Sequence, residues 1–566
     1  MKIFKFLYRK KQKYSQEREI APDEIFLDSR NLPNFDVHQF EGRLEKPISK
    51  KTIIVLGAFF LFIGIVFAGK IGALQILKGE AFVLRSESNR LQNTPLFSER
   101  GIIYDRNGIE IAWNSPGEDV FPKRSYIDKP GISHILGYIG YPARDKKGVY
   151  YQTKFIGKDG LESFYNKKLN GENGLKIIET DALMKVRSES IVKPPKNGDS
   201  LTLTIDTAVQ SKLYETMKAL SKDKSFSGGA GIVMDVHTGE LLALASFPEY
   251  SSTILAEGDN RTAILQFQND KRKPFLNRAI SGLYAPGSIV KPFIAIAALN
   301  EKIITPEKKI LSTGSISIQN PYFPDKKSVF KDWRAQGWVN IKDALAVSSN
   351  VYFYEIGGGF EGQKGLGIAN IEKYVRMFGL GEIAGIDLPG EVKGVIPNPE
   401  WKAKNFNGEP WRLGDTYHTA IGQYGFSVTP LQMVRGIAAI ANGGELVTPH
   451  IVKGADVKFK TINNISKDNF EVVTSGMRQA VTDGTAKGLN IPQVEIAAKT
   501  GTAEVGISKK RVNSWVLGFF PYENPRFAFV VVMEKGPRKN TIGGLFVMRQ
   551  LLEWMIVNTP QYLNTK

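Results

Sequence analysis

The chain lacks cysteine and has only five histidines among its 566 residues. Without cysteine it can form no disulfide bond or thiolate zinc site, and no N-terminal cysteine can carry a lipid. It also has no phosphate-binding loop of the full pattern Gly-x-x-x-x-Gly-Lys followed by Ser or Thr. We therefore expect neither a metal nor another cofactor. The histidines, which lie too far apart in the sequence to suggest a metal cluster, are His38, His134, His237, His418 and His450.

Basic residues outnumber acidic ones, which gives a formal net charge of +18. The lysines and arginines are scattered rather than gathered into a stripe, so their pattern does not favour nucleic-acid binding. A basic balance also suits a protein that works beside anionic lipid or cell-wall polymers. The hydrophobic fraction of 42% is ample for a buried core, and the length suggests about three to four domains.

A long apolar segment, TIIVLGAFFLFIGIVFAG, occupies residues 52–69 and contains no charge. Lys50 and Lys51 stand directly before it. The run is longer than a soluble core helix needs, and a leader of roughly fifty residues is too long for a cleaved signal peptide. By the positive-inside rule, we expect an uncleaved signal anchor with its tail in the cytoplasm and everything after about residue 77 outside.

The sequence pattern divides the chain into four parts. A polar tail at 1–51 precedes the transmembrane anchor at 52–77, a β-rich pedestal at 78–198 and the main domain at 199–566. In the pedestal, GIIYDRNGIEIA places an Asn-Gly turn between two apolar runs, a pattern typical of a β-hairpin. One short helix is expected near residues 161–169.

The main domain has predicted strands at both of its ends and predicted helices between them. SLTLTID alternates like a strand, and GAGIVMDVHTGELLALAS reads as two strands joined by a turn. This order predicts an α+β fold with a mostly antiparallel sheet flanked by helices. Helices are expected at 207–220, 289–300, 342–347, 371–377, 430–442 and 469–481, with a last one that ends near 557, and strands at 494–505, 514–520 and 526–533.

Three short motifs follow one another in this domain. They are Ser-Ile-Val-Lys at 288–291, Ser-Ser-Asn at 348–350 and Lys-Thr-Gly-Thr at 499–502. Each one alone can arise by chance in a chain rich in lysine, serine and glycine. Together and in this order, they are typical of an acyl-transfer site with a serine nucleophile.

The first motif supplies a candidate nucleophile and base. Positions three apart share a helix face, so the Lys291 amine should lie near the Ser288 hydroxyl. Pro292 cannot donate the hydrogen bond of a helix interior, which places the helix start at or near Ser288. Lys291 is the candidate base if burial and a positive neighbour, Lys499, lower its pKa. The alternative is an ordinary amphipathic helix with a solvent-facing lysine.

The other two motifs can complete such a site. Ser348 and Asn350 can present a hydroxyl and an amide to one cavity, although this string alone is more typical of a polar turn that ends a helix. Gly501 lies in a strand-like run, where glycine suggests that another backbone, such as a peptide substrate, approaches closely. Thr500, Thr502 and the motif's ammonium could then hold a terminal carboxylate. Backbone N–H groups of the first and third motifs could hold the oxyanion.

From residue 52 onward the chain resembles the class B penicillin-binding proteins, monofunctional D,D-transpeptidases that cross-link peptidoglycan. The resemblance includes ERGIIYDRNG, HILGYIG, GKDGLE, NRAISGLYAPGSIVKP, SSNVYFYEIG and KTGTAEV. GVIPNPEWK and PWRLGDTYHTAIGQYGFSVTPLQ resemble the elongation type, penicillin-binding protein 2, more than the septal type, which stays the alternative. The resemblance implies a transpeptidase fold on an elongated pedestal. It also implies a single span in the bacterial inner membrane, with the catalytic domain outside the cytoplasm.

The resemblance also implies roles for the motif residues. Ser288 would attack the penultimate D-alanine of a pentapeptide stem and release the terminal D-alanine, and a neighbouring stem's amine would resolve the acyl-enzyme into a cross-link. Lys291 would be the base, Ser348 the proton relay and Asn350 a hydrogen-bond partner of the substrate amide. Lys499 and the two threonines would grip the carboxylate. β-Lactams would acylate the same serine, and attack by water on the acyl-enzyme would give a D,D-carboxypeptidase side activity.

The expected partners follow from the same resemblance. The pedestal and the transmembrane helix would contact a membrane glycan polymerase of the shape, elongation, division and sporulation family. Two other functions fit the sequence less well. One large β-lactamase class would need a Glu-x-x-Leu-Asn loop between the second and third motifs, and none occurs there. A transmembrane β-lactam sensor would normally need several spans or a cytoplasmic effector domain.

The sequence departs from the elongation-type pattern at two places. Tyr424 stands where many members have glycine, which puts the local loop geometry in question. Some members bind zinc near the second motif through cysteine and histidine, whereas FKDWRAQGWVN offers neither. We expect no metal there.

Overall fold

The chain divides into two units, Met1–Leu91 and Gln92–Lys566. In the first unit, helix α2 spans Lys50–Gly72 and continues as a π-helical turn, η2, over Ala73–Leu77. These 28 residues are long and apolar enough to cross a membrane, and they contain the predicted anchor segment. The computed structural model describes residues 49–80, 82–83, 91–117, 120–146, 150–180, 185–320, 323–506 and 509–563. The predicted tail lies outside these residues, except for its last three.

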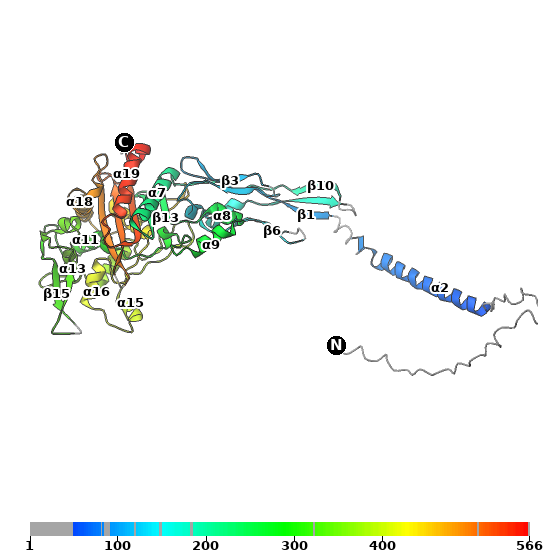
Figure 1. Cartoon of the computed structure of the whole chain (residues 1–566), viewed down its shortest axis with the longest axis horizontal. Helices are drawn as coiled ribbons and strands as arrows, with labels where there is room; N and C mark the ends of the chain where they lie inside the picture. Colours follow the sequence, from blue (N-terminus) through cyan, green and yellow to red (C-terminus); the bar gives the residue numbers. More distant parts are fainter. Residues whose placement is uncertain are drawn as a thin grey trace, which may run out of the picture. The chain divides into compact units, whose positions relative to one another are not determined.

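The second unit begins with short strands that form two small sheets (Figure 1). The predicted hairpin is formed by β2 and β3, and Gly108 in its turn has a φ of +83°, which glycine adopts without strain. The helix expected at 161–169 is split into α5 and α6. One sheet has the order β1-β9-β10, with β1 at Leu91–Leu96, β9 at Gly174–Thr180 and β10 at Val186–Lys193. The other has the order β11-β2-β3-β4, with β11 at Leu201–Thr202, β2 at Ile103–Tyr104, β3 at Glu110–Ser115 and β4 at Lys123–Tyr126. The short helices are α4 (Ser133–Leu136), α5 (Gly160–Phe164) and α6 (Asn166–Asn170).

A buried ion cluster ties this part of the chain together. Glu162 accepts hydrogen bonds from Arg100 Nε at 2.5 Å and from Arg124 Nε at 2.8 Å, and all three side chains are almost fully buried. Arg100 belongs to the ERGIIYDRNG string and Glu162 to the GKDGLE string. These two strings therefore have a structural role, because each buried charge is paired with an opposite one.

The main domain is built on a five-stranded sheet of order β13-β12-β22-β21-β20. Every neighbouring pair is antiparallel, so the predicted α+β fold with an antiparallel sheet is confirmed. Strand β20, which carries the third motif, forms one edge of the sheet. The strands are β12 (Gly228–Asp235), β13 (Leu241–Phe247), β20 (Ala497–Val505), β21 (Arg511–Phe520) and β22 (Phe527–Pro537).

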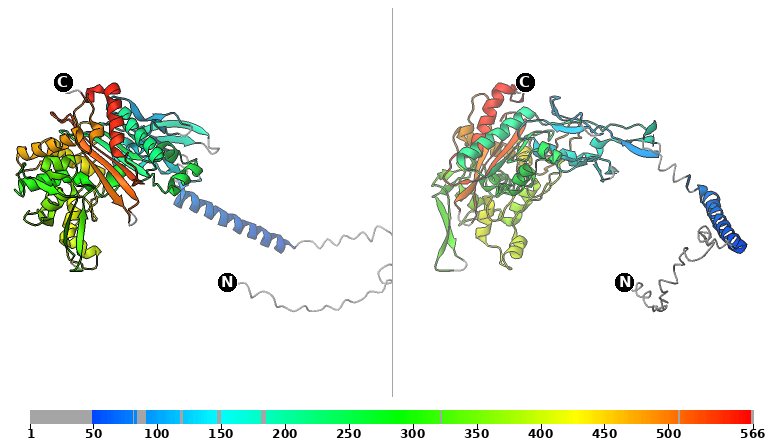
Figure 2. Two further views of the ribbon diagram at one scale, coloured as in Figure 1. Left: turned by 60° about the vertical axis from the view of Figure 1, so that its left-hand side comes forward. Right: turned by 45° about the vertical axis from the view of Figure 1, so that its right-hand side comes forward.

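Helices pack on both faces of this sheet (Figure 2). Helices α7 and α19 bury their apolar side chains against one face, and α11 and α17 lie in the core on the other. The predicted helices are present as α7 (Thr207–Lys224), α11 (Lys291–Asn300), α12 (Ile341–Ala346), α14 (Gly367–Met377), α17 (Pro430–Ala441), α18 (Lys467–Thr482) and α19 (Gly544–Asn558).

Several elements were not predicted from the sequence. The most important is α13 (Asn350–Gly358), whose first residue belongs to the second motif. The others include the helices α8 (Ser252–Glu257), α9 (Arg261–Asn269), α10 (Arg278–Ser281), α15 (Pro399–Asn405) and α16 (Leu413–Ala420), and the strands β14 (Ile310–Ser312), β15 (Ser315–Gln319), β16 (Lys327–Lys331) and β17 (Gly337–Val339).

Candidate active site

Ser288 lies in a 3-10 turn, η3 (Gly287–Val290), directly before helix α11. Pro292 is in the first turn of α11, where a missing N–H costs nothing, so the helical segment starts where the sequence predicted. Gly287 has a φ of +58°, and its N–H donates to the Gly422 carbonyl at 2.9 Å. The nucleophile turn is therefore held from behind by the loop that contains Gly422.

Lys291 is completely buried, with 0% of its surface exposed. Its amine donates to the carbonyl of Ser348 and to Asn350 Oδ1, both at 2.8 Å, and to the Ser349 carbonyl at 3.2 Å. It also lies 3.4 Å from Ser348 Oγ. Among the described residues no hydrogen bond joins this amine to the Ser288 hydroxyl, which the sequence predicted as its neighbour. The lysine instead connects the first motif to the second.

The second motif forms the turn between α12 and α13. Ser348 has a φ of +59°, a left-handed conformation that is uncommon for a residue with a side chain and often marks a functional turn. The Ser349 hydroxyl caps α13 by accepting from the N–H of Tyr352, and Asn350 is the first residue of that helix. The turn thus ends one helix and starts another. As a result, the Ser348 carbonyl and Asn350 Oδ1 both accept hydrogen bonds from the Lys291 amine.

Asp332 is a functional residue that the sequence did not reveal. One of its carboxylate oxygens accepts from Ser349 Oγ at 2.7 Å, from the Val351 N–H at 3.0 Å and from Ser312 Oγ at 3.2 Å. It therefore fixes the start of α13 and the turn before it. The residue lies in FKDWRAQGWVN, and no local pattern in this string indicates its contact with the second motif.

Electrostatics favours a neutral amine in this site. Burial lowers the pKa of Lys291 to about 7, while the Asp332 carboxylate opposes this shift. Lys499 is also 0% exposed and donates to the Thr500 carbonyl at 3.1 Å. Burial lowers the pKa of Lys499 well below its usual value, and positive charge on Lys291 lowers it further. Burial, rather than Lys499, is thus the main cause of the shift at Lys291.

The third motif lies on the edge strand β20. Thr500 Oγ1 donates to Thr485 Oγ1 at 2.8 Å, and Thr502 is exposed. A β-carbon at Gly501 would lie 2.9 Å from Ile289 Cγ2 and 3.1 Å from the Pro286 carbonyl oxygen. This glycine therefore makes room for the chain's own nucleophile turn. The expected approach of a substrate backbone along this strand stays a prediction.

A cavity of about 720 Å³ brings the three motifs together. Six of the eight predicted site residues line it, and these are Ser288, Ser348, Asn350, Thr500, Gly501 and Thr502. The other two, Lys291 and Lys499, are buried and donate to groups of the second and third motifs. All eight predicted site residues thus belong to one place in the fold.

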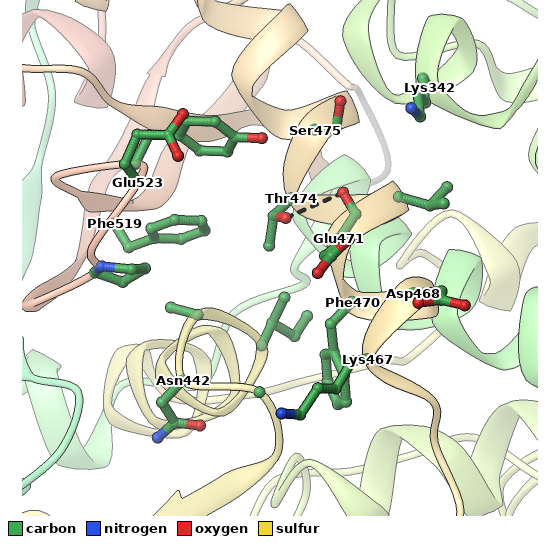
Figure 3. A pocket seen from close by; sticks show the side chains of 16 residues that line it. Lys342, Asn442, Lys467, Asp468, Phe470, Glu471, Thr474, Ser475, Phe519 and Glu523 are labelled. Atoms are coloured by element: carbon green, nitrogen blue, oxygen red, sulfur yellow. Dashed lines mark hydrogen bonds between the residues drawn. The ribbon is translucent and has the colours of Figure 1, made fainter.

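A second cavity, of about 740 Å³, contains none of the predicted residues. Figure 3 shows it between side chains of α18, such as Glu471 and Thr474, and the region of Phe519 and Glu523. It holds acidic, basic and apolar groups. We assign no chemistry to it.

The loop around Tyr424 shows how the chain accommodates a side chain where glycine is common. Tyr424 has a φ of +63°, so the position does favour glycine. Its ring stacks on Phe406 with 6.0 Å between the centroids, and this packing offsets backbone strain. Two further rings, Trp401 and Trp411, contact it edge-on.

Among the residues that the structure describes, no group of three or more His, Asp or Glu side chains could hold a metal ion.

Comparison with known proteins identifies the penicillin-binding protein family, which the sequence motifs resemble. The family model of the penicillin-binding protein transpeptidase domain matches residues 229–546, and that of the penicillin-binding protein dimerisation domain matches 118–203. The peptidoglycan D,D-transpeptidase MrdA of Acinetobacter baumannii is 29% identical, over 87% of this chain and 86% of that protein.

Two solved structures are also similar. Penicillin-binding protein 2 of Pseudomonas aeruginosa, in complex with WCK 5153, is 29% identical with a TM-score of 0.66, and the match covers 83% of this chain and 99% of that one. Penicillin-binding protein 2 of Helicobacter pylori, in complex with MreC, is 27% identical with a TM-score of 0.70, over 83% of this chain and 100% of that one. The transpeptidase match spans more than half of the chain, which therefore belongs to the family of penicillin-binding protein transpeptidases, as its motifs predicted.

Proposed function

We propose that this chain is a peptidoglycan D,D-transpeptidase of the elongation type, which cross-links stem peptides and is blocked by β-lactams. The observation that carries this proposal is the shared cavity, where Ser288 lies with the second and third motifs beside a buried amine whose pKa is about 7. The relatives support it, because they are named peptidoglycan D,D-transpeptidases and penicillin-binding protein 2.

Acylation begins when the Ser288 hydroxyl attacks the carbonyl of the penultimate D-alanine. A serine hydroxyl is a poor nucleophile until a base takes its proton, and Lys291 in its neutral form is that base. The backbone N–H groups of Ser288 and Thr502 hold the oxyanion, and losing one such donor typically costs about 3–4 kcal/mol of barrier.

The second and third motifs handle the leaving group. Ser348 Oγ lies 3.4 Å from the Lys291 amine and relays the proton to the leaving D-alanine. Asn350 uses Oδ1 to accept from Lys291, which leaves its NH₂ group to donate to a substrate carbonyl. The Thr502 hydroxyl donates to the terminal carboxylate, and the Thr500 hydroxyl does so by turning away from Thr485, to which it donates in this structure. An incoming stem amine then reverses these steps and forms the cross-link, whereas attack by water gives a carboxypeptidase side reaction.

We further propose that the four-part division of the chain holds. Helix α2 anchors the protein in the bacterial inner membrane with the catalytic domain outside the cytoplasm, because basic residues precede this apolar helix. The pedestal at 78–198 would contact a membrane glycan polymerase. A protein partner is in keeping with the related Helicobacter pylori penicillin-binding protein 2, whose structure is a complex with MreC.

Benzylpenicillin distinguishes this function from a β-lactamase. The full chain in detergent should gain the mass of one penicillin, measured by intact-protein mass spectrometry, and keep it for many minutes. The reason is that, among the described residues, no carboxylate lines the cavity to activate a water molecule for hydrolysis. Rapid turnover of penicillin without a lasting adduct would instead indicate a hydrolase.

Asp332→Asn should slow acylation by penicillin by about tenfold, since hydrogen bonds to a charged group contribute about 1.5–3 kcal/mol. The carboxylate raises the pKa of Lys291, so its loss lowers that pKa and moves the rise in rate to lower pH. Acylation rates measured from pH 5 to 9 report both effects. Asp325→Asn, an exposed acid in the turn after β15, is the control and should behave like the wild type. An unchanged profile in Asp332→Asn would contradict this role.

A further inference from the structure

The cavity extends well beyond the three motifs and is positively charged. Besides the motif residues it is lined by Lys487 and Arg549, together with hydroxyl and apolar groups. All of its lining residues belong to the described part of the chain, and none of them is an aspartate or a glutamate. The positive charge of the cavity therefore favours an anionic ligand. The extent of the cavity beyond the motifs leaves room for a ligand larger than the two alanines at the end of a stem.

Lys487 and Arg549 are connected, through hydrogen bonds and a short stretch of chain, to Thr500, which is proposed to bind the terminal carboxylate. Thr500 donates to Thr485, and Lys487 follows two residues later at the start of the 3-10 helix η4 (Lys487–Leu489). Arg549, on α19, donates through Nη1 to the Gly488 carbonyl at 2.9 Å. Lys487 and Arg549 thus line the part of the cavity next to Thr500, where the leaving D-alanine would lie.

The two side chains are available to bind an anion. The Lys487 amine is exposed and has no ion-pair or hydrogen-bond partner among the described residues. Arg549 pairs with Glu553 at 2.7 Å, but the two side chains are 42% and 40% exposed. Such exposed pairs are weak, so a substrate carboxylate can compete for the guanidinium.

We propose that Lys487 and Arg549 bind a carboxylate of the acceptor stem peptide, an inference that rests on the proposed function. The acceptor amine must reach the acyl carbon along the path by which the leaving amine departed. Its nitrogen forms the new amide bond, the bond from that carbon to Ser288 Oγ breaks, and the amine proton returns to this oxygen through the base. The acceptor stem therefore enters on the side of the two cations.

A matched pair of acceptors tests this subsite. The full chain in detergent is given pentapeptide-bearing glycan as donor, and either a stem tetrapeptide with a free C-terminal carboxylate or its C-terminal amide as acceptor. The wild type should use the carboxylate form about tenfold more efficiently, as expected for two partly exposed charge pairs. Lys487→Gln and Arg549→Gln should each reduce this preference, and the double variant should lose it. Lys222→Gln, an exposed lysine on α7, is the control.

Acylation by benzylpenicillin separates the possible outcomes. The rate of this acylation should be unchanged in Lys487→Gln, in Arg549→Gln and in the double variant, because penicillin carries one carboxylate, which the threonines bind. A preference that survives in the double variant would overturn the subsite, and so would an equal loss of penicillin acylation, which would place these residues on the donor side. A wild type that binds penicillin but forms no cross-links with either acceptor would overturn the proposed function as well. Lys487→Gln breaks no hydrogen bond or ion pair among the described residues, so its expected effect comes from the lost charge and not from a loss of folding.

Discussion

Replacing Ser288 by alanine should abolish covalent labelling of the full chain by fluorescent penicillin. The proposed acyl bond forms on this oxygen, and no other side chain in the site combines a free hydroxyl with the start of a helical turn. The Ser288 hydroxyl has no hydrogen-bond partner among the described residues. The free energy of unfolding should therefore change by no more than about 0.5 kcal/mol.

Gel fluorescence measures the labelling, and thermal unfolding measures the stability. Ser475→Ala is a matched control, because Ser475 lines the second cavity (Figure 3) and should not affect labelling. Labelling that persists in Ser288→Ala would move the nucleophile to another residue. Loss of both labelling and cooperative unfolding would mean that the serine is structural.

Replacing Lys291 by methionine should slow acylation of Ser288 by about 10²–10⁴-fold, the usual contribution of a positioned base. Because burial lowers the pKa of Lys291 to about 7, the amine is mostly protonated below that pH and mostly neutral above it. The acylation rate of the wild type should therefore rise through pH 7 and level off above it. The methionine variant, which has no titrating amine at this position, should lose that rise.

Stopped-flow measurements with a chromogenic β-lactam from pH 5 to 9 provide these rates. Lys342→Met, at the second cavity, serves as the control and should keep the wild-type profile. A Lys291→Met variant with a near-normal rate would refute the role of this lysine as the base. A wild-type profile that is flat across pH 7 would do the same.

Elements with strong local signals could be predicted from the sequence. Helix α17, expected at 430–442, spans Pro430–Ala441, because Thr429 caps it and proline suits its first turn. Strand β22, expected at 526–533, spans Phe527–Pro537 and is almost entirely buried, as its continuous apolar run requires. The start of α11 followed from Pro292 in the same way.

The parts that depend on contacts between distant residues could not be predicted. Nothing near Asp332 indicates that its carboxylate reaches Ser349, because this contact depends on how β16 and α13 pack. Spacing placed Lys291 beside Ser288, but its hydrogen bonds go to a turn more than fifty residues away in the sequence. The sequence predicts that a substrate backbone approaches Gly501, but it does not reveal that the turn carrying Ser288 also packs against this glycine.

One assay measures whether this protein cross-links peptidoglycan stems. The full chain in detergent is incubated with pentapeptide-bearing glycan, and the products are digested to muropeptides and analysed by mass spectrometry. We expect release of D-alanine together with cross-linked dimers, and both should disappear with benzylpenicillin or in Ser288→Ala. Release of D-alanine without any dimers would identify the protein as a carboxypeptidase and not a transpeptidase.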